Sequence, residues 1–185
     1  MNEIIMEYKT YKHNPPHLFM PNTKYFITGA ILNHHRILSS EKAKEKLFEY
    51  ILKSATHFNW NLEDWVILDN HYHLMINAPE KVETLSLLMG NIHRYSAIWI
   101  NKNVSVPNSL NKIWHNYRDT CITYEKSYYA RLNYIWFNPV KHGYVDSPEK
   151  WKFGSYYERC KREMEYLKRI NKNYPCDKLK IEDDF

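Results

Sequence analysis

Three features are scarce in this sequence: cysteine, glycine and long apolar runs. The 185 residues include 3 cysteines without a Cys-x-x-Cys pair, which argues against a disulfide scaffold or a thiolate zinc finger. Only 4 glycines exclude a glycine-rich repeat. The longest apolar runs, such as residues 65–68, fall far short of the roughly 18 residues that span a bilayer, and the N-terminus lacks an apolar signal core. We therefore expect a soluble, cytoplasmic protein with reduced thiols and no membrane segment.

The sequence otherwise has an ordinary globular balance with abundant aromatic residues. Hydrophobic residues make up 44% and charged residues 25% of the chain, which favours one domain with a real core. The net charge of +5 permits a polyanionic partner without requiring one. Aromatic residues reach 16%, and rings beside Lys and Arg suit single-stranded nucleic acid. Core packing explains the same composition equally well.

Hydrophobic periodicity predicts alternating strands and helices. Short apolar segments bounded by polar residues indicate strands, and apolar residues at three- to four-residue spacing indicate helices. Asp69-Asn70 favours a tight hairpin, Ser39-Ser40-Glu41 favours a helix start, and Pro139 predicts that the third helix ends at Asn138. The predicted strands are 25–32, 65–68, 72–78 and 112–123, and the predicted helices are 41–58, 85–99 and 126–138.

This order of elements predicts the fold class and the organisation of the chain. Strand, helix, strand, strand, helix, strand is the split βαβ pattern of an α+β, ferredoxin-like antiparallel sheet, here with an added helix. Residues 150–172 hold 8 Lys or Arg and 3 Glu, which suits either a phosphate-contacting helix or a solvated one. The predicted segments are an N-terminal arm without strand or helix period (1–22), the main domain (23–148), a basic helical extension (149–173) and an acidic tail (174–185).

Two patterns could carry chemistry. His71 and His73 lie two apart in a predicted strand, so both imidazoles project from one sheet face and could bind one metal ion. Tyr134 and Asn138 lie four apart in a predicted helix, so the phenol and the amide share one face. Two imidazoles and an amide oxygen leave positions open for water and phosphate, which suits Mg²⁺ or Mn²⁺. Ordinary core histidines and a helix-terminal Asn are the alternatives.

Together these motifs resemble the single-domain HUH tyrosine transposases, and most closely the REP-associated tyrosine transposases. The match departs from the usual pattern at Tyr72, where the family often has an apolar residue, at Asp69, where Pro is common, and at Asn138, where insertion-sequence relatives often have Gln. The resemblance covers most of the chain and is carried by Lys24-Tyr25-Phe26-Ile27-Thr28, by residues 68–76, by residues 134–145 and by Trp151-Lys152-Phe153-Gly154-Ser155.

The resemblance implies a reaction and roles for these residues. It makes Tyr134 the nucleophile, His71 and His73 the metal-binding pair, and Asn138 the third ligand. Attack by the phenol on a phosphodiester would give a 5′-phosphotyrosine intermediate and a free 3′-hydroxyl, so that strands can be cleaved and rejoined. The implied cofactor is Mg²⁺ or Mn²⁺.

The resemblance also implies a partner, which is single-stranded DNA with an adjacent hairpin in the bacterial nucleoid. In relatives, one chain or a homodimer assembles the site, and both arrangements stay open for this chain. Trp136, Trp151 and Tyr156 could stack on bases, although core packing is the usual role of such rings. The candidate DNA contacts are the basic residues Arg94, Arg118, Lys152, Arg159, Arg162 and Arg169.

Two other functions remain open from the sequence. The first is a catalytically inactive nucleic-acid-binding module of the same fold, which would bind DNA without metal. The second is a phosphodiesterase that uses His71 and His73 with a carboxylate such as Asp69. A hydrolase would release DNA without a covalent protein adduct and would need Asp69 rather than Tyr134.

Overall fold

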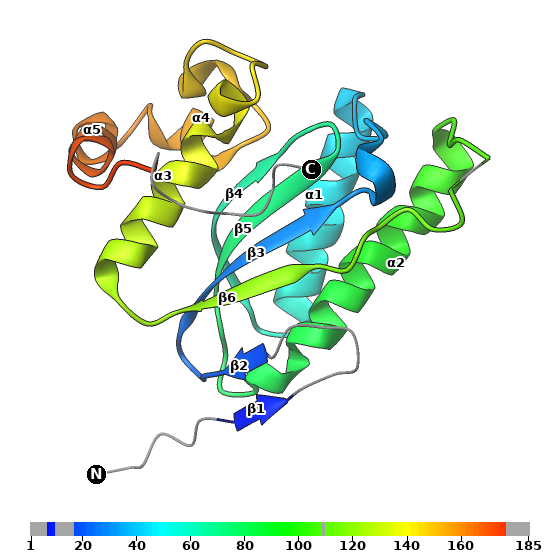
Figure 1. The fold of residues 1–185 in the computed structure, drawn as a ribbon, viewed down its shortest axis with the longest axis horizontal. Helices are drawn as coiled ribbons and strands as arrows, with labels where there is room; N and C mark the ends of the chain where they lie inside the picture. Colours follow the sequence, from blue (N-terminus) through cyan, green and yellow to red (C-terminus); the bar gives the residue numbers. More distant parts are fainter. Residues whose placement is uncertain (1–6, 10–16, 109, 177–185) are drawn as a thin grey trace.

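A four-stranded sheet between two layers of helices organises the molecule (Figure 1). The computed structural model describes residues 7–9, 17–108 and 110–176. No helix in this part of the chain is long and apolar enough to cross a membrane. The elements are β1 (Glu7–Lys9), β2 (His17–Phe19), β3 (Lys24–Ala30), η1 (Leu32–His34), α1 (Glu41–His57), β4 (Asn61–Ile67), β5 (His71–Asn77), η2 (Val82–Thr84), α2 (Leu85–Asn103), β6 (Arg118–Ile122), α3 (Glu125–Lys141), η3 (Pro148–Lys150), α4 (Ser155–Arg159) and α5 (Met164–Asn173).

The sheet topology confirms the predicted α+β, ferredoxin-like class. The strand order is β4-β5-β3-β6, and every neighbouring pair is antiparallel. Because β5 and β3 lie in the middle of the sheet, each has a strand on both sides. The two helices that connect sheet strands, α1 and α2, cover one face, while α3 crosses the other face (Figure 1).

Alternation along the central strands separates two hydrophobic cores. On β3, Tyr25 and Ile27 face α1 and α2, whereas Phe26 faces α3. On β5, Tyr72 and Leu74 join the first core, and Met75 joins the second. This is the two-residue period of an extended chain. It places every second residue of β5, starting at His71, under α3.

The predicted hairpin between β4 and β5 forms, and its turn uses no left-handed residue. Neither Asp69 nor Asn70 has a positive φ angle. Instead, the carbonyl of Asn70 accepts a bond from the amide of Ile31 at 2.7 Å, and that of Asp69 accepts one from Leu38 at 2.8 Å. The turn is therefore fixed by the chain that follows β3, directly before His71.

Two predicted strands were wrong in extent: the one at 65–68 begins already at Asn61, in β4, and the one at 112–123 is shorter than expected. The strand predicted at 112–123 is only Arg118–Ile122, because β3 ends at Ala30 and leaves residues 112–117 no strand to pair with beyond one bridge between Ile31 and Trp114. The arm at 1–22, whose sequence shows no strand period, contains β1 and β2, which form a separate two-stranded sheet. Antiparallel pairing of such short strands leaves little periodic signal in the sequence.

The third helix also extends further than predicted. Pro139 lies inside α3, which continues to Lys141. Pro139 is buried, and the amide of His142 still bonds to the carbonyl of Asn138 at 3.0 Å. A proline removes only one helical bond, and here that loss falls within the last turns, so packing outweighs the local preference. The extra turn brings Lys141 onto the same helix as Tyr134.

The basic segment at 149–173 forms three short helices rather than one long helix. Its apolar residues Tyr156, Leu167 and Ile170 belong to the core under α3. Several of its charges pair within the segment, including Lys161 with Glu158 at 2.7 Å. The segment therefore packs against the main fold, and much of its charge is solvated. The acidic residues 182–184 of the predicted tail lie outside the described residues.

Gly29 leaves room for the ring of Tyr72, the residue between the two histidines. Gly29 pairs with Tyr72 across β3 and β5, and a Cβ atom at Gly29 would overlap the Tyr72 ring. That ring is fully buried, and its hydroxyl bonds to Nε2 of His93 at 2.9 Å, so it has no room to move. Tyr72 thus packs on the sheet face opposite to the histidines.

We predict that Gly29→Ala destabilises the fold by about 1–3 kcal/mol, the usual cost of overpacking a core. The matched control is Gly90→Ala in α2, where a Cβ atom would meet nothing within 4 Å. That change should stabilise the protein by up to about 1 kcal/mol through helix propensity. Urea unfolding of both variants tests this, and equal effects would contradict the close packing of Tyr72 on Gly29.

Candidate functional site

Strand β5 directs two histidines toward α3. His71 is 2% exposed and His73 is 0% exposed, and their ring centroids lie 5.1 Å apart. This matches the predicted placement of both imidazoles on one sheet face. Because β5 is bonded to strands on both sides, the backbone that carries the pair is rigid.

Helix α3 brings the phenol and the amide to the same place. The ring of Tyr134 lies 5.3 Å from that of His73, edge to face. One turn later, Oδ1 of Asn138 lies 3.1 Å from Nε2 of His71. Both α3 side chains are buried. A single chain therefore brings together the four residues that the sequence motifs singled out.

His73 is held as a neutral ring. Burial lowers its pKa to about 3, and the positive charges of His142 and Lys141 act in the same direction. Nδ1 shares a hydrogen bond of 2.9 Å with the hydroxyl of Thr28, and the ring stacks on Phe26 at 5.2 Å. Only a neutral imidazole can bind a metal ion, and the Thr28 contact fixes its orientation.

His71 lies between two amide oxygens. Nδ1 is 2.8 Å from Oδ1 of Asn70, and Nε2 is 3.1 Å from Oδ1 of Asn138. A neutral imidazole has one N–H group, so it can donate to only one of these oxygens. If Asn70 accepts the hydrogen bond from Nδ1–H, the lone pair of Nε2 faces a lone pair of Oδ1 of Asn138. This repulsion is removed if the Asn138 amide is rotated so that Nδ2 donates to Nε2 of His71, or if a cation binds between the two atoms.

The donor set fits a metal ion that completes its shell from substrate or water. Among the described residues, no group of three or more His, Cys, Asp or Glu is placed to hold a metal ion. The available donors are the two imidazoles and the Asn138 amide, whose Nδ2 has no hydrogen-bond partner in the described part of the chain. Nitrogen and neutral oxygen donors with open positions suit Mn²⁺ or Mg²⁺ bound together with phosphate oxygens.

Asp69 is engaged elsewhere. Its carboxylate pairs with the buried ammonium of Lys44 at 2.8 Å and with Arg36 at 2.9 Å. These contacts fasten the β4–β5 turn to the start of α1 and to the segment after β3. A hydrolase that needs Asp69 as a metal ligand or base would have to break both ion pairs.

Lys141 is a site residue that the sequence prediction missed. Its Nζ donates to Oη of Tyr134 at 3.0 Å and lies 4.9 Å from the centroid of that ring. A spacing of seven residues on one helix would have indicated this contact. The expected helix end at Asn138 hid it. His142 was missed for the same reason, and its ring lies 4.9 Å from that of His71.

A buried carboxylate, Asp64, fastens α3 to the sheet. It is 0% exposed, and its oxygens accept bonds from Nε1 of Trp136 at 2.7 Å, Oγ of Ser155 at 2.6 Å and Nη2 of Arg159 at 2.8 Å. Burial raises the pKa of the Asp64 carboxyl, and the three donors act in the opposite direction. The contacts join β4, α3 and α4 at one point.

The six candidate DNA contacts do not form one surface. Arg159 binds Asp64 and Glu163, and Lys152 pairs with Glu41 at 2.6 Å. Arg94 is exposed on α2, in the helical layer opposite α3. Arg162 and Arg169 are exposed near or on α5. Arg118 lies nearest the histidines along the sheet, because it pairs with Thr28, the strand neighbour of His73.

The three candidate stacking rings are placed unequally. Trp136 is 2% and Tyr156 8% exposed, and both belong to the core under α3. Trp151 is half-buried, and its Nε1 donates to the carbonyl of Ile67 at 3.2 Å. Core packing therefore accounts for Trp136 and Tyr156.

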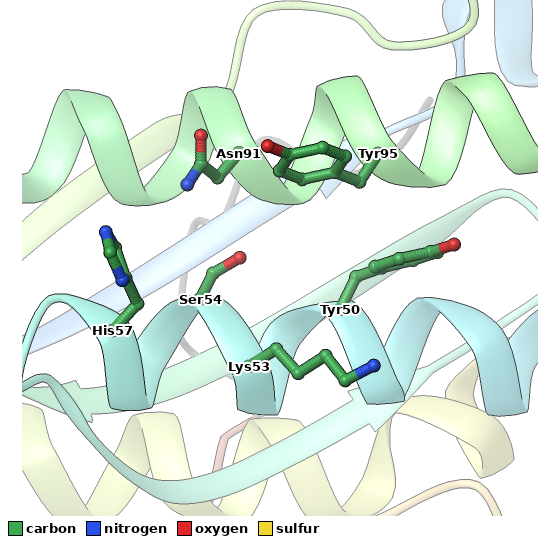
Figure 2. Close-up of a pocket in the computed structure, with 6 residues that line it drawn as sticks. All are labelled: Tyr50, Lys53, Ser54, His57, Asn91 and Tyr95. Carbon is green, nitrogen blue, oxygen red and sulfur yellow. The ribbon is translucent and has the colours of Figure 1, made fainter.

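A separate hollow lies between α1 and α2, away from these residues (Figure 2). Its volume is about 370 Å³, and the rings of Tyr50 and Tyr95 face each other across it at 6.2 Å. None of the motif residues lines it. The lining residues are Tyr50, Lys53, Ser54, His57, Asn91 and Tyr95.

The fold and the site together define a class of protein. A ferredoxin-like sheet whose central strand presents two histidines to a tyrosine and an asparagine on a packed helix is the arrangement that the transposase resemblance implied. Residues 20–135 match the family model described as "Transposase IS200 like". The chain belongs to this family.

Individual relatives agree with this membership. The chain is 24% identical over 162 residues to a Haemophilus influenzae protein assigned as a REP-associated tyrosine transposase, covering 78% of this chain and 90% of the relative. It is 25% identical over 148 residues to the REP-associated tyrosine transposase of Escherichia coli K12, covering 75% of this chain and 84% of that relative. A solved REP-associated tyrosine transposase, bound to a REP hairpin, shares the fold with a TM-score of 0.68 at 23% identity, covering 98% of this chain and 95% of that one.

We predict that Asp64→Ala destabilises the protein by about 3–5 kcal/mol, because it leaves the half-buried Arg159 without its main partner. The matched control is Asp146→Ala, which removes an exposed ion pair with Lys150 and should change stability by no more than about 0.5 kcal/mol. Urea unfolding midpoints measure both. If the two variants unfold alike, Asp64 does not anchor α3.

Proposed function

We propose that this protein cleaves and rejoins single-stranded DNA through a covalent bond to Tyr134. The observation that carries the proposal is the convergence of Tyr134, His71, His73 and Asn138 in one buried site of a transposase-family fold. A hairpin or repeat is the proposed DNA partner, by analogy with the relative bound to a REP hairpin.

The proposed reaction is a transesterification at one phosphodiester. Oη of Tyr134 forms a bond to phosphorus as the bond to the 3′-oxygen breaks. The phenol proton passes to solvent, and the leaving 3′-oxygen takes up a proton. The products are a 5′-phosphotyrosine and a free 3′-hydroxyl. Because the phosphoester bond is conserved, another 3′-hydroxyl can reverse the step and join strands.

Lys141 prepares the nucleophile in this proposal. Its ammonium group is hydrogen bonded to the atom that attacks, so it orients the hydroxyl and stabilises negative charge that develops there. Lys141 is exposed although the Tyr134 ring is buried. The hydroxyl therefore lies where the site meets the surface, within reach of a DNA strand.

His71, His73 and Asn138 are the residues that would hold a divalent cation, Mg²⁺ or Mn²⁺. When bound, such an ion supplies positive charge to the phosphate oxygens of the substrate. The chain prepares for it in three ways: Thr28 orients His73, burial keeps that ring neutral, and Oδ1 of Asn70 can accept a hydrogen bond from Nδ1–H of His71, which leaves Nε2 of that ring as a donor atom for the ion.

The DNA-binding module without chemistry is the alternative class of function. An inactive module needs neither a buried, neutral His73 beside a second histidine nor a lysine ammonium bonded to the hydroxyl of a buried tyrosine. The hydrolase alternative needs a carboxylate at the histidines, and Asp69 is held in two ion pairs. The geometry therefore favours tyrosine chemistry over both.

We predict that Tyr134→Phe abolishes covalent attachment of DNA and leaves hairpin binding within about twofold, because the change removes only the hydroxyl from a packed ring. The substrate is a 3′-end-labelled single strand from the DNA flanking the gene, incubated with Mg²⁺ or Mn²⁺. Label that migrates with the protein on a denaturing gel measures the adduct. A chelator present from the start should also prevent formation of the adduct.

The matched control is Tyr129→Phe, the same change on the same helix, which should keep the adduct. Cleavage that persists in Tyr134→Phe would refute the assignment of the nucleophile. Free cleaved DNA without adduct would support a hydrolase. Binding without any cleavage in the unmodified protein would support the inactive module.

A further inference from the structure

A second cavity opens between the first half of α3 and the end of α5. Its volume is about 540 Å³, which lies within the range of small-ligand sites. The lining residues are Tyr124, Lys126, Ser127, Ala130, Arg131, Asn173, Tyr174 and Pro175. These described lining residues include two cations and no carboxylate. The charge of the cavity therefore suits an anion.

Arg131 is the unusual group in this cavity. Its side chain is half-buried, and this burial lowers the pKa of the guanidinium. Within the described residues it forms no ion pair, and its buried Nε has no hydrogen-bond partner. Its Nη1 donates to the hydroxyl of Ser127, a neutral group. A half-buried guanidinium without an acidic partner is costly to the fold unless a ligand supplies the anion.

The position of Arg131 ties the cavity to the reactive tyrosine. Arg131 lies three residues before Tyr134, so the two share a face of α3. Both contact Phe26: the guanidinium lies 5.9 Å from the centroid of that ring, and the Tyr134 ring lies 6.2 Å from it. Phe26 in turn stacks on His73. The cavity and the proposed active site are therefore adjacent.

The other walls of the cavity are an exposed aromatic ring and a segment held by a hydrogen bond. Tyr124 is 66% exposed at the start of α3, where its ring could stack on a base. The opposite wall is held in place because Nδ2 of Asn133 donates to the carbonyl of Tyr174 at 3.0 Å. The cavity combines a rigid wall, an exposed ring and two cations, which is the combination that a nucleotide needs.

We infer that this cavity binds one nucleotide of the unpaired DNA strand next to the bond that is cleaved. Arg131 and Lys126 take the phosphate, and Tyr124 offers its ring to the base. This inference rests on the proposed function, because it takes single-stranded DNA as the substrate. It adds a position at which the strand is held while Tyr134 reacts.

The test measures equilibrium binding without any reaction. A fluorescein-labelled ten-residue oligothymidylate is titrated with protein that carries Tyr134→Phe, in chelator, over a series of salt concentrations. Removing one cation that neutralises a phosphate lowers the slope of log K against log salt by about 0.7 for a single strand. Arg131→Met should lower the slope by that amount and weaken binding several-fold, whereas Arg131→Lys keeps the charge and should keep most of the slope.

The matched control is Lys42→Met, which removes an exposed charge from α1 in the opposite helical layer and should leave the slope unchanged. The melting temperature of Arg131→Met should be unchanged or higher, because a desolvated charge is removed. A slope unchanged in Arg131→Met, or lowered equally in Lys42→Met, would overturn the inference. So would a loss of stability in Arg131→Met that Arg131→Lys does not reverse.

This readout is independent of the adduct experiment. If the slope changes but no tyrosine adduct forms, the cavity binds DNA and the proposed chemistry fails. If the adduct forms but the slope does not change, the chemistry stands and the nucleotide cavity fails.

Discussion

The contact between the buried Asp64 carboxylate and its three donors determines where the helix with Tyr134 lies. Strand β4 supplies the acid, α3 supplies Trp136, and α4 supplies Ser155 and Arg159. An isolated carboxylate in a core is strongly unfavourable, so separating Asp64 from its donors on α3 and α4 costs stability. The histidines are fixed separately, by a central strand. The distance between the tyrosine and the histidines therefore depends on this contact.

The charges around the site follow one pattern. The histidine nearest the tyrosine is neutral because it is buried, Lys141 contacts the phenol oxygen, and Arg131 lies one turn away on the same helix. Asp69, the acidic residue nearest to His71 in sequence, is neutralised by Lys44 and Arg36. A polyanionic strand entering this region meets cations and neutral donors, which is the environment that phosphoryl transfer requires.

Sequence periodicity predicts the parts of the site that depend on local geometry. Two-residue alternation places His71 and His73 on one face, and four-residue spacing places Tyr134 with Asn138. The order of elements predicts the sheet that brings them together. Lys141 was missed because Pro139 predicts a helix end at Asn138, whereas packing of Pro139 lets α3 continue to Lys141. The bond from Arg159 to Asp64 joins residues that are far apart in the chain. The cavity that Arg131 lines is likewise formed by two distant segments, α3 and the end of α5. No local sequence pattern predicts such contacts.

The central claim is that Tyr134 becomes covalently linked to DNA. The most direct measurement is mass spectrometry of the adduct after nuclease and trypsin digestion, with fragmentation to locate the modified residue. The account predicts a nucleotide phosphate on Tyr134 in samples prepared with Mg²⁺ or Mn²⁺, and none in samples prepared with chelator. A phosphate on another tyrosine, such as Tyr128 or Tyr129 of the same helix, or an adduct that forms equally without metal, would contradict it.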